Sequence, residues 1–447
     1  MFGDYGYNRI VDFEPQWVRK GVKCPKPEHV SKKLKEICSF FSEAGQDTVS
    51  LVVPKIKESK SNNKPDYSKM YLTLEAIDNC NFTFFGREAL VDYIYLYLLS
   101  EGQQVTKEQI RQMIVGDWNG FEYSVDNGKT WNEMEPTTIT IWGQYELSAF
   151  SVPELSAGNV MMIKGVNDGL YVQGIDFEYS NLIGLIDSDG RFNAYGNVMS
   201  IAYGDDFVGQ TSMQGKGFVA LFDTSFITGN ASKIISAENL ILPATTLSPE
   251  CYRGMFQGCG LLTKAPKLPA TILADNCYSF MFDGCVSLTQ APELPATTLA
   301  DGCYRGMFED CTSLTTAPEL PATTLAEDCY SAMFWGCTAL TKAPNLPATT
   351  LAQYCYGNMF NGCTSLTTAP ELPARTLVDG CYYDMFWGCS SLNYIKCLAT
   401  DISASNCTDG WVFGVSSTGT FVKKAGVEWQ IDSYYGIPNG WTVEEVD

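Results

Sequence analysis

Apolar residues in the first part of the chain follow a helical period. Between residues 28 and 44 they recur at intervals of three and four, while lysines occupy the other face. This spacing predicts an amphipathic helix. The residues that define its apolar face are Val30, Leu34, Ile37 and Phe41. We therefore expect an N-terminal helical anchor over 1–54, followed over 55–69 by a polar linker without periodicity.

The stretch from 70 to 217 shows the shorter period of β-strands. Segments such as Tyr71-Leu72-Thr73-Leu74 are separated by turn sequences rich in Asp, Asn and Gly. A helical insertion over 87–116 interrupts them, and Thr106 with Gln109 matches a capping box at the start of its second helix. This pattern predicts a β-sandwich-like domain that carries a helical insertion.

A repeat of constant length follows. The hexapeptide Cys-Tyr-x-x-Met-Phe begins at six evenly spaced positions with a period of 26: Cys251, Cys277, Cys303, Cys329, Cys355 and Cys381. A fixed period of this size indicates a solenoid, in which each coil buries its apolar face against its neighbours. We expect the solenoid over 218–397, with a degenerate first coil at 218–243 and a terminal cap over 398–447.

The repeat unit predicts its own local structure. Cys303, Met307 and Cys311 follow one another at every fourth position, which predicts a short helical turn that faces inward. Leu314 and Ala317 bracket a short strand, which the following prolines are expected to end. The glycine before the second Cys suits a turn with positive φ, and Asp310 is the exception to it.

The charge is distributed unevenly. The chain has 30 Lys and Arg against 51 Asp and Glu, a formal charge of −21. Residues 1–69 nevertheless carry a net charge of +4, and the remainder carries −25. The acidic body argues against nucleic-acid binding, which requires clustered Lys and Arg. A basic segment on an acidic body favours an attachment segment joined to a display segment, and a solvated tail is the alternative.

Targeting signals and membrane spans are not expected. The chain start lacks the apolar run of an export signal. The most apolar stretch, Ala89 to Leu99, contains Asp92 and is far shorter than the roughly 20 residues that cross a bilayer. We therefore expect no membrane insertion and folding in a cytoplasm.

The cysteines permit two interpretations. Fourteen of the 17 lie in or just after the repeats. They could form a disulfide staircase suited to an exterior environment, or two ladders of buried thiols in which Cys acts as a small apolar residue. Without an export signal we favour the thiol ladders. Their eight-residue spacing does not suit zinc, and we expect no metal and no cofactor.

Catalytic motifs are weak. His29 is the single histidine, so most His-dependent catalysis is excluded. The stretch from Ser124 to Trp131 matches the Asp box of sialidases, but it occurs once and is a hairpin staple rather than a catalytic element. Asp187-Ser188-Asp189-Gly190 is expected to form a turn rather than a calcium loop. No catalytic residue is assigned, and we expect the protein not to be an enzyme.

Variation between the coils marks the candidate binding residues. Core positions repeat nearly unchanged, while a few others vary freely, so the variable positions should face solvent as columns on one side. Aromatic rings at these positions suit sugar faces or a protein partner. Trp335 and Trp387 could instead cover neighbouring coils or an inter-subunit contact. The candidates are Phe280, Trp335, Tyr354, Tyr383 and Trp387.

The repeats resemble a known family. Met255-Phe256-Gln257-Gly258-Cys259 and its copies are similar to the Ala-Phe-x-Gly-Cys-x-x-Leu core of BspA-like leucine-rich repeats. The Leu-Pro-Ala-Thr-Thr-Leu segments resemble proteins of gut Bacteroidetes and of their tailed (crAss-like) phages. The resemblance covers about residues 70–447 apart from the helical insertion, and implies a surface-exposed binding or adhesion protein. The expected fold class is thus α+β, mostly β, with a leucine-rich-repeat solenoid at its C-terminal end.

These observations lead to a functional hypothesis. We expect a phage virion structural protein, of the head or tail fibre or decoration type, whose helix at Val30, Leu34, Ile37 and Phe41 docks onto other virion proteins. Its repeats would bind host-surface glycan or protein, and the chain could form a trimer or another homo-oligomer. A bacterial cell-surface adhesin of the same repeat family is the alternative, and a glycan hydrolase is a third class.

Overall fold

A computed structural model describes residues 65–116, 118–141, 144–167, 170–172, 184–213 and 217–447. The chain separates into two compact units, Met1–Asp66 and Tyr67–Asp447, and the second contains almost all described residues. The predicted anchor with Val30, Leu34, Ile37 and Phe41 lies outside the described residues, as does most of the linker. The described part is mostly β with few helices.

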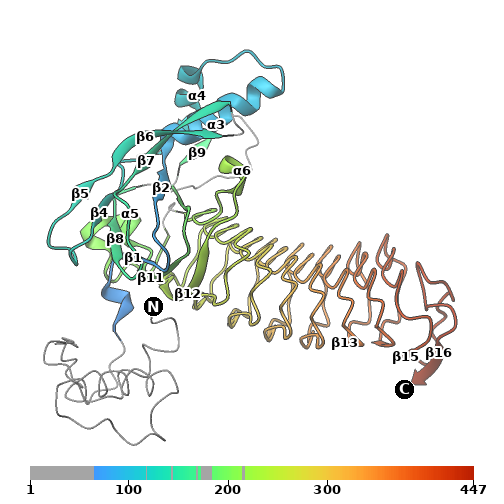
Figure 1. Cartoon of the computed structure of the whole chain (residues 1–447). Coiled ribbons are helices and arrows are strands. Elements are labelled where there is room, and N and C mark those ends of the chain that lie inside the picture. The colour runs from blue at the N-terminus through green and yellow to red at the C-terminus, as the bar shows by residue number, and fades with distance from the viewer. Residues whose placement is uncertain (1–64, 117, 142–143, 168–169, 173–183, 214–216) are drawn as a thin grey trace, which may run out of the picture. The chain divides into compact units, whose positions relative to one another are not determined.

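Two sheets form the β-rich part that precedes the repeats (Figure 1). The larger sheet has the order β12-β11-β1-β8-β4-β5, and the smaller has the order β10-β2-β7-β6. All neighbouring strands in them are antiparallel except β11 and β12, which are parallel. The strands of the larger sheet are β1 (Leu72–Ala76), β4 (Glu122–Ser124), β5 (Asn132–Glu133), β8 (Val160–Lys164), β11 (Phe192–Asn197) and β12 (Ile234–Ile241). Those of the smaller sheet are β2 (Phe82–Phe85), β6 (Glu135–Ile141), β7 (Tyr145–Ser151) and β10 (Leu185–Ser188).

Alternating apolar residues from both sheets enter one core. Leu74 of β1 lies opposite Ala194 of β11 and Met161 of β8, and all three are buried. Phe82 of β2 packs edge-on against Phe192 with 5.2 Å between ring centroids. This period-two burial is what a sheet with one covered face requires.

Short elements complete this part of the chain. A two-stranded sheet pairs β3 (Ile114–Val115) with β9 (Tyr171–Val172). The remaining elements are η3 (Tyr67–Lys69), α5 (Ser200–Tyr203), η4 (Gly204–Phe207) and α6 (Ser225–Thr228).

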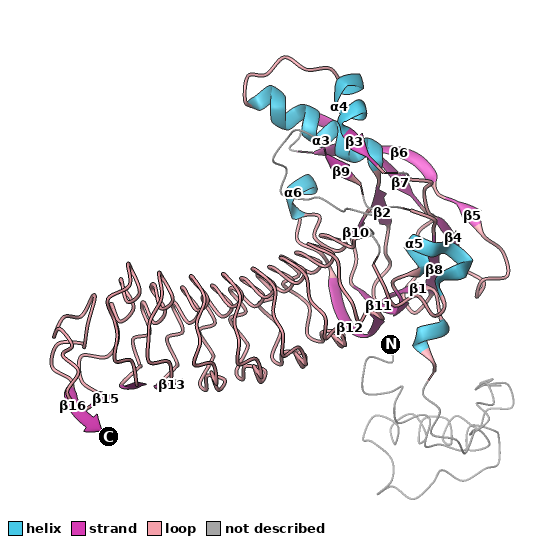
Figure 2. Ribbon diagram, turned by 180° about the vertical axis from the view of Figure 1, so that it is seen from behind, coloured by secondary structure: helices cyan, strands magenta, loops and turns pink. Residues whose placement is uncertain are grey.

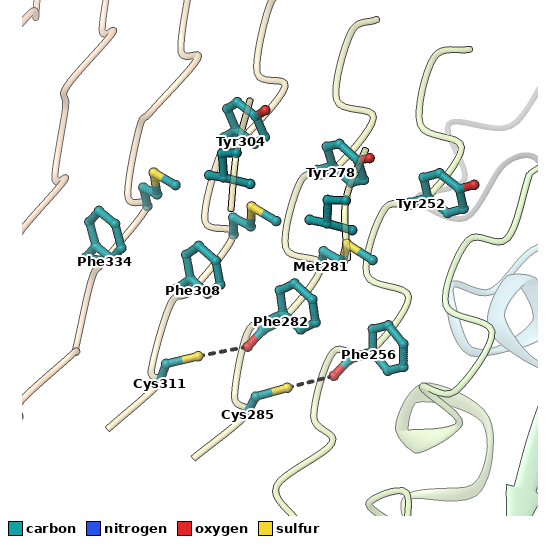
Figure 3. Close-up of a cluster of buried hydrophobic side chains, with 14 of the residues drawn as sticks. Tyr252, Phe256, Tyr278, Met281, Phe282, Cys285, Tyr304, Phe308, Cys311 and Phe334 are labelled. Carbon is teal, nitrogen blue, oxygen red and sulfur yellow. Dashed lines mark hydrogen bonds between the residues drawn. The ribbon is translucent and has the colours of Figure 1, made fainter. Parts of the chain in front are cut away.

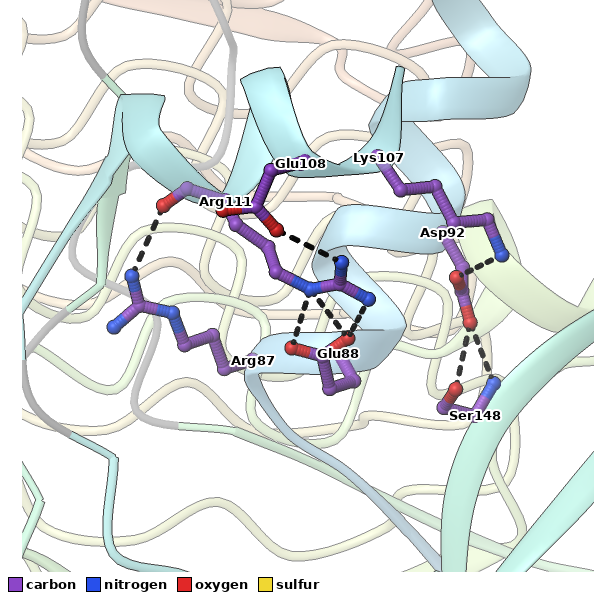
Figure 4. A network of polar contacts seen from close by, with 7 residues as sticks. All are labelled: Arg87, Glu88, Asp92, Lys107, Glu108, Arg111 and Ser148. Atoms are coloured by element: carbon purple, nitrogen blue, oxygen red, sulfur yellow. Dashed lines mark hydrogen bonds and ion pairs between the residues drawn. The ribbon is translucent and has the colours of Figure 1, made fainter.

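The predicted helical insertion contains two helices, α3 (Arg87–Ser100) and α4 (Lys107–Met113). The expected capping box between Thr106 and Gln109 is present at the start of α4. Figure 4 shows the polar contacts that hold the helices together. The buried Asp92 accepts hydrogen bonds from the Ser148 backbone N–H and hydroxyl, at 2.8 Å each, and pairs with Lys107. Its charge is therefore compensated on two sides.

The repeats form a row of closely stacked coils (Figure 2). Every second residue of the segment that contains the hexapeptide donates its N–H to the following coil; Tyr278, for example, donates to Cys303 O at 3.1 Å. The residues between them donate three positions back within their own coil, as Met281 does to Tyr278 O. We call this segment of each coil the turn run.

The turn run corrects the prediction of a helical turn. Its backbone has positive φ at every fourth residue, for example 59° at Gly302, 58° at Gly306 and 52° at Asp310. An α-helix cannot contain such residues, so the run is a series of β-turns. Cys303, Met307 and Cys311 still face inward and are buried. The predicted positive φ of the glycine before the second Cys is confirmed, and Asp310 adopts the same conformation.

The opposite side of the coils forms short parallel ladders. In most coils the ladder is reduced to single bridges such as Thr316 with Lys342. A continuous parallel sheet forms only toward the C-terminus, from β13 (Thr368–Leu372), β14 (Tyr394–Cys397), β15 (Thr420–Lys424) and β16 (Thr442–Val446). Since β13 contains Pro370, the first proline of the unit does not end the strand there, contrary to expectation.

The stack extends beyond the predicted break at 397. Cys407 lies one full period after Cys381, and its carbonyl accepts the Tyr382 N–H at 3.0 Å. Trp411 takes the position that Met fills in earlier coils, and its carbonyl accepts the Phe386 N–H at 2.9 Å. A further coil therefore precedes the end of the chain, although only its first Cys preserves the hexapeptide.

The interior of the stack consists of files of identical side chains (Figure 3). Consecutive repeat tyrosines stack with 5.6–6.2 Å between ring centroids, and consecutive phenylalanines with 5.5–5.8 Å. At the N-terminal end the files continue into Phe218 and Phe222. At the C-terminal end the buried Trp411 stacks on Tyr382 and on Trp429. These rings close the core at both ends.

Candidate functional site

One position of the turn run carries a different residue in almost every coil, because its side chain does not pack in the core. These residues directly follow the buried Phe of each coil, or Val412 in the last coil, and recur once per period, so stacking places them in a line. We call them the post-Phe column: Gln257, Asp283, Glu309, Trp335, Asn361, Trp387 and Phe413. Trp335 is 41% exposed and Phe413 is 45% exposed. Large exposed rings on one edge of a regular structure indicate a binding surface.

Phe280 lies between two cations. Its ring centroid is 6.0 Å from the Arg253 guanidinium and 5.9 Å from that of Arg305, which are contributed by the preceding and following coils. Phe280 has a positive φ of 56°, and its ring leans over Gly306. The half-buried ring of Phe280 therefore covers part of the following coil.

Tyr354 and Tyr383 are brought together by the stack. Their rings meet edge-to-face with 6.3 Å between centroids. The Tyr354 ring also leans over Gly380 of the next coil. Both residues are half-buried, so each keeps part of its ring in contact with solvent.

Trp387 is the centre of a larger group of rings. It contacts Phe413 with 4.4 Å between ring centroids and Tyr434 with 6.0 Å, and Phe413 and Tyr434 are also 6.0 Å apart. We call Trp387, Phe413 and Tyr434 the C-terminal aromatic cluster. The sequence analysis missed two of its members. Phe413 could have been found because it lies one period after Trp387, whereas Tyr434 lies outside the repeat and has no such signal.

Two carboxylates adjoin this cluster. Asp384 and the Trp387 ring both lie over Gly410 of the next coil. Asp409 belongs to the next coil, and its Oδ1 is buried without a hydrogen-bond partner among the described residues. Burial and then the Asp409 charge raise the pKa of Asp384, and the Asp384 charge raises the pKa of Tyr383. The electrostatic potential at this end of the turn runs is therefore negative.

A second acidic group lies nearer the start of the column. Burial raises the pKa of Asp283 to about 6, although Gln257 donates a hydrogen bond to it at 2.9 Å. Burial and the charge of Asp283 raise the pKa of Glu309 to about 7. These carboxyls carry partial charge near neutral pH, and the next side chain of the column is the exposed Trp335.

The Asp box forms the hairpin staple expected of it. Asp126 accepts hydrogen bonds from the backbone N–H groups of Lys129 and Thr130, and Ser124 accepts from Gly128 at 2.9 Å. These bonds, led by that of Thr130, lower the pKa of Asp126 to about 2. Trp131 is half-buried rather than deep in the core, and its ring packs against Tyr71 at 4.8 Å. Asp126 thus holds the turn through hydrogen bonds to backbone and side-chain donors.

The cysteines of the described residues are free thiols, and all of them are buried. The second Cys of each coil donates its S–H to the carbonyl of Phe in the preceding coil; Cys311, for example, donates to Phe282 O at 3.1 Å. Burial raises the pKa of Cys277 to about 12, and it also raises the pKa of Cys311 well above the usual range of a thiol. Buried thiols of this kind pack as small apolar side chains and are poor nucleophiles.

Other classes of site are not found in the described part of the chain. No group of three or more His, Cys, Asp or Glu side chains there is arranged to hold a metal ion. No helix among the described residues combines the length and apolar character needed to cross a membrane. Comparisons with protein-family models, curated proteins and solved structures reveal no match to this chain. The site must therefore be argued from its own geometry.

Proposed function

We propose that this chain is a non-enzymatic display protein whose stacked coils form a leucine-rich-repeat solenoid with a binding edge. In this proposal the β-rich part is a spacer, and the edge formed by the turn runs binds glycan or protein on a host surface. The protein would be a phage virion component of the fibre or decoration type. The resemblance of the repeats to BspA-like proteins supports the same role.

The observation that carries the proposal is the composition of the post-Phe column. The stack needs Cys, Tyr, Met and Phe at its inward positions, and these are nearly invariant from coil to coil. The packing of the core does not determine which residues occupy the post-Phe column. Two of its seven positions are nevertheless Trp and one is Phe, and they lie on a solvent-facing edge. Exposed rings beside carboxylates and amides provide the apolar faces and hydrogen-bonding groups that sugars and protein hot spots require.

Attachment to the particle is assigned to the basic N-terminal segment. Residues 1–69 carry a net charge of +4 on a chain of −21, and they contain the predicted amphipathic helix. An apolar helical face flanked by lysines suits docking onto an acidic protein surface.

Density-gradient separation of the producing culture tests the location. We expect the protein, followed by peptide mass spectrometry, to band with virus particles, and a chain lacking residues 1–45 to be lost from them. Unchanged attachment of the shortened chain would refute the anchoring role. Recovery in the bacterial envelope would instead establish the adhesin alternative.

Binding to host cells tests the edge itself. We expect the combined Trp335→Ala, Tyr383→Ala and Trp387→Ala variant to lose most cell binding. The matched control is Ile272→Ala, because Ile272 is an exposed apolar residue on the ladder side of the coils. Equal binding by both variants would exclude the turn runs as the receptor-binding edge.

One observation favours a second candidate, a glycan hydrolase. The pKa values of Asp283 and Glu309, about 6 and about 7, suit proton transfer near neutral pH, and an exposed Trp follows them in the column. Release of reducing sugar from host polysaccharide that disappears in Glu309→Gln would establish this activity. Release that persists in Glu309→Gln would remove Glu309 as its acid.

A further inference from the structure

We propose that the C-terminal aromatic cluster, together with Asp384 and Asp409, binds the ammonium group of an amino-substituted glycan. This inference rests on the proposed function and specifies the chemistry of its ligand. It concerns only one end of the turn-run edge, where rings and carboxylates meet.

The three rings present faces in different directions. Trp387 and Phe413 are tilted by 33° to each other at 4.4 Å, while Tyr434 stands at 81° to the first and 70° to the second. Phe413 is 45% exposed, and Trp387 and Tyr434 are half-buried. Aromatic faces attract a cation through the quadrupole of the ring, and Trp does so most strongly.

The carboxylates beside the rings lack a counter-charge. Neither Asp384 nor Asp409 forms an ion pair with Lys or Arg within the described residues, and Asp409 Oδ1 is buried without a hydrogen-bond partner there. Their backbones are bonded to each other, Asp384 N–H to Asp409 O at 2.8 Å, so the stack holds both side chains on adjacent coils. Both residues are half-buried, and carboxylates without a counter-charge beside ring faces favour a cation as the ligand.

This combination selects among ligand classes. An anion would be repelled by both carboxylates, and a neutral sugar could stack on the rings but would leave the charges uncompensated. An ammonium group satisfies the ring faces and the carboxylates together. Flat exposed rings also accept the apolar face of a pyranose, which favours an amino sugar as the carrier of that ammonium.

Trp335 provides an internal comparison. It occupies the same place in its coil as Trp387, but its column neighbours are Glu309 and Asn361, and no other aromatic ring packs against it among the described residues. Trp335 therefore has a carboxyl neighbour in the column but no second ring among the described residues, so it lacks the cluster of ring faces found at Trp387.

Calorimetric titration of the full chain with glucosamine oligosaccharide tests the proposal, at pH 6.5 and low ionic strength. The N-acetylated oligosaccharide of the same length is the uncharged control. We expect the amino form to bind at least about ten-fold more tightly. We expect Trp387→Ala and the isosteric Asp409→Asn each to weaken it about ten-fold, and Ile272→Ala, on the ladder side of the coils, to leave it unchanged. An unchanged unfolding temperature in Asp409→Asn would show that the fold is retained.

Three outcomes would overturn the inference. Equal affinity for the two oligosaccharides would remove the ammonium group as the determinant. Equal losses in Ile272→Ala and Trp387→Ala would remove the cluster as the binding site. Tight binding of a tetralysine peptide with the same dependence on Trp387 and Asp409 would identify a protein amine rather than a glycan as the ligand. If host-cell binding still depends on the turn-run edge in any of these cases, the proposed function stands without this ligand.

Discussion

At the scale of single residues, the turn run couples each coil to the next through left-handed positions. A side chain at such a position leans over the equivalent residue of the following coil, and where that side chain is large the following residue is often glycine. Phe280 over Gly306, Tyr354 over Gly380 and Asp384 over Gly410 are examples. The coils are therefore not independent copies, because a ring in one coil requires space in the next.

Gly306→Ala tests this coupling. Alanine itself is accepted at the equivalent position of the next coil, since Ala332 has a φ of 55°. At Gly306, however, an added Cβ would meet the ring of Phe280. We expect Gly306→Ala to lower the free energy of unfolding by about 1 kcal/mol more than a substitution that only strains φ. Chemical denaturation followed by circular dichroism measures the difference.

Gly254→Ala is the matched control for this prediction. Gly254 also has a φ of 58°, but its added Cβ would approach only the flexible end of Gln257, at 2.9 Å. The double variant Phe280→Ala with Gly306→Ala should recover the extra loss, since the obstructing ring is gone. Equal destabilisation by Gly254→Ala and Gly306→Ala would show that the ring imposes no constraint.

The raised carboxyl pKa values make a second prediction at this scale. Folding raises the pKa of Asp283 to about 6 and of Glu309 to about 7, so the native state binds these protons more tightly than the unfolded chain does. Their contribution to stability is fully present below about pH 4 and is lost as the pH rises through 6 to 7. We expect Asp283→Asn and Glu309→Gln to gain unfolding temperature relative to wild type between pH 4.5 and pH 8. The control Glu293→Gln, at an exposed residue, should show no such gain. A loss of unfolding temperature with rising pH in Asp283→Asn or Glu309→Gln, relative to wild type, would contradict the burial of these two carboxyls.

At the scale of elements, the burial of the repeat cysteines should protect them from alkylation and oxidation. Each of the six coils with the hexapeptide contributes two buried Cys side chains, and the raised pKa leaves almost no thiolate at neutral pH. We expect iodoacetamide to leave the repeat cysteines of the native protein unmodified for hours and to label them all in guanidinium chloride. Peptide mass spectrometry measures both. Rapid labelling of the native protein would contradict the ladders of free thiols. Detection of disulfide-linked peptides from neighbouring coils would contradict them as well.

The elements also show how far the sequence could predict the fold. The constant period placed the coils, the inward Cys, Met and Phe, and the positive φ before the second Cys, because a repeated core position leaves a repeated residue. It did not reveal that the turn run is non-helical, since a recurrence at every fourth position occurs both in a helix and in successive turns. Cys407 continued the period unnoticed because Trp411 replaces the Met of the hexapeptide. Tyr434 reaches the candidate site only through tertiary packing, which no local pattern reports.

At the scale of the whole described unit, one strand joins its two parts. β12 pairs with β11 of the larger sheet, and it also makes the first bridges of the stack, from Ser236 to Lys264 and from Ile241 to Lys267. The buried core likewise continues from Phe192 through Phe222 into the phenylalanine file. The β-rich part thus covers the first coil without an interruption in the core, as a capping element of a repeat stack must.

A stack built by nearest-neighbour contacts should tolerate the loss of a whole coil but not of half of one. Deleting Thr312–Cys337 removes one whole period. In the intact chain Asp310 lies over Gly336; after the deletion it would lie over Gly362, which is the equivalent glycine of the following coil. The Phe280–Gly306 and Tyr354–Gly380 pairs also survive this deletion. We therefore expect a folded protein that retains a cooperative thermal transition by circular dichroism, at a temperature only slightly below that of wild type.

The control is the deletion of Thr312–Thr324, which removes half a period. After this deletion the turn runs of the later coils would stack on the ladder side of the earlier ones, and polar residues would occupy core positions between the stacked tyrosines and phenylalanines. We therefore expect loss of the cooperative transition. Since Trp387, Phe413 and Tyr434 all follow the excised coil, the whole-coil deletion should also preserve binding of the amino oligosaccharide while it removes Trp335. Loss of the cooperative transition in the whole-coil deletion as well would show that the coils depend on contacts beyond their immediate neighbours.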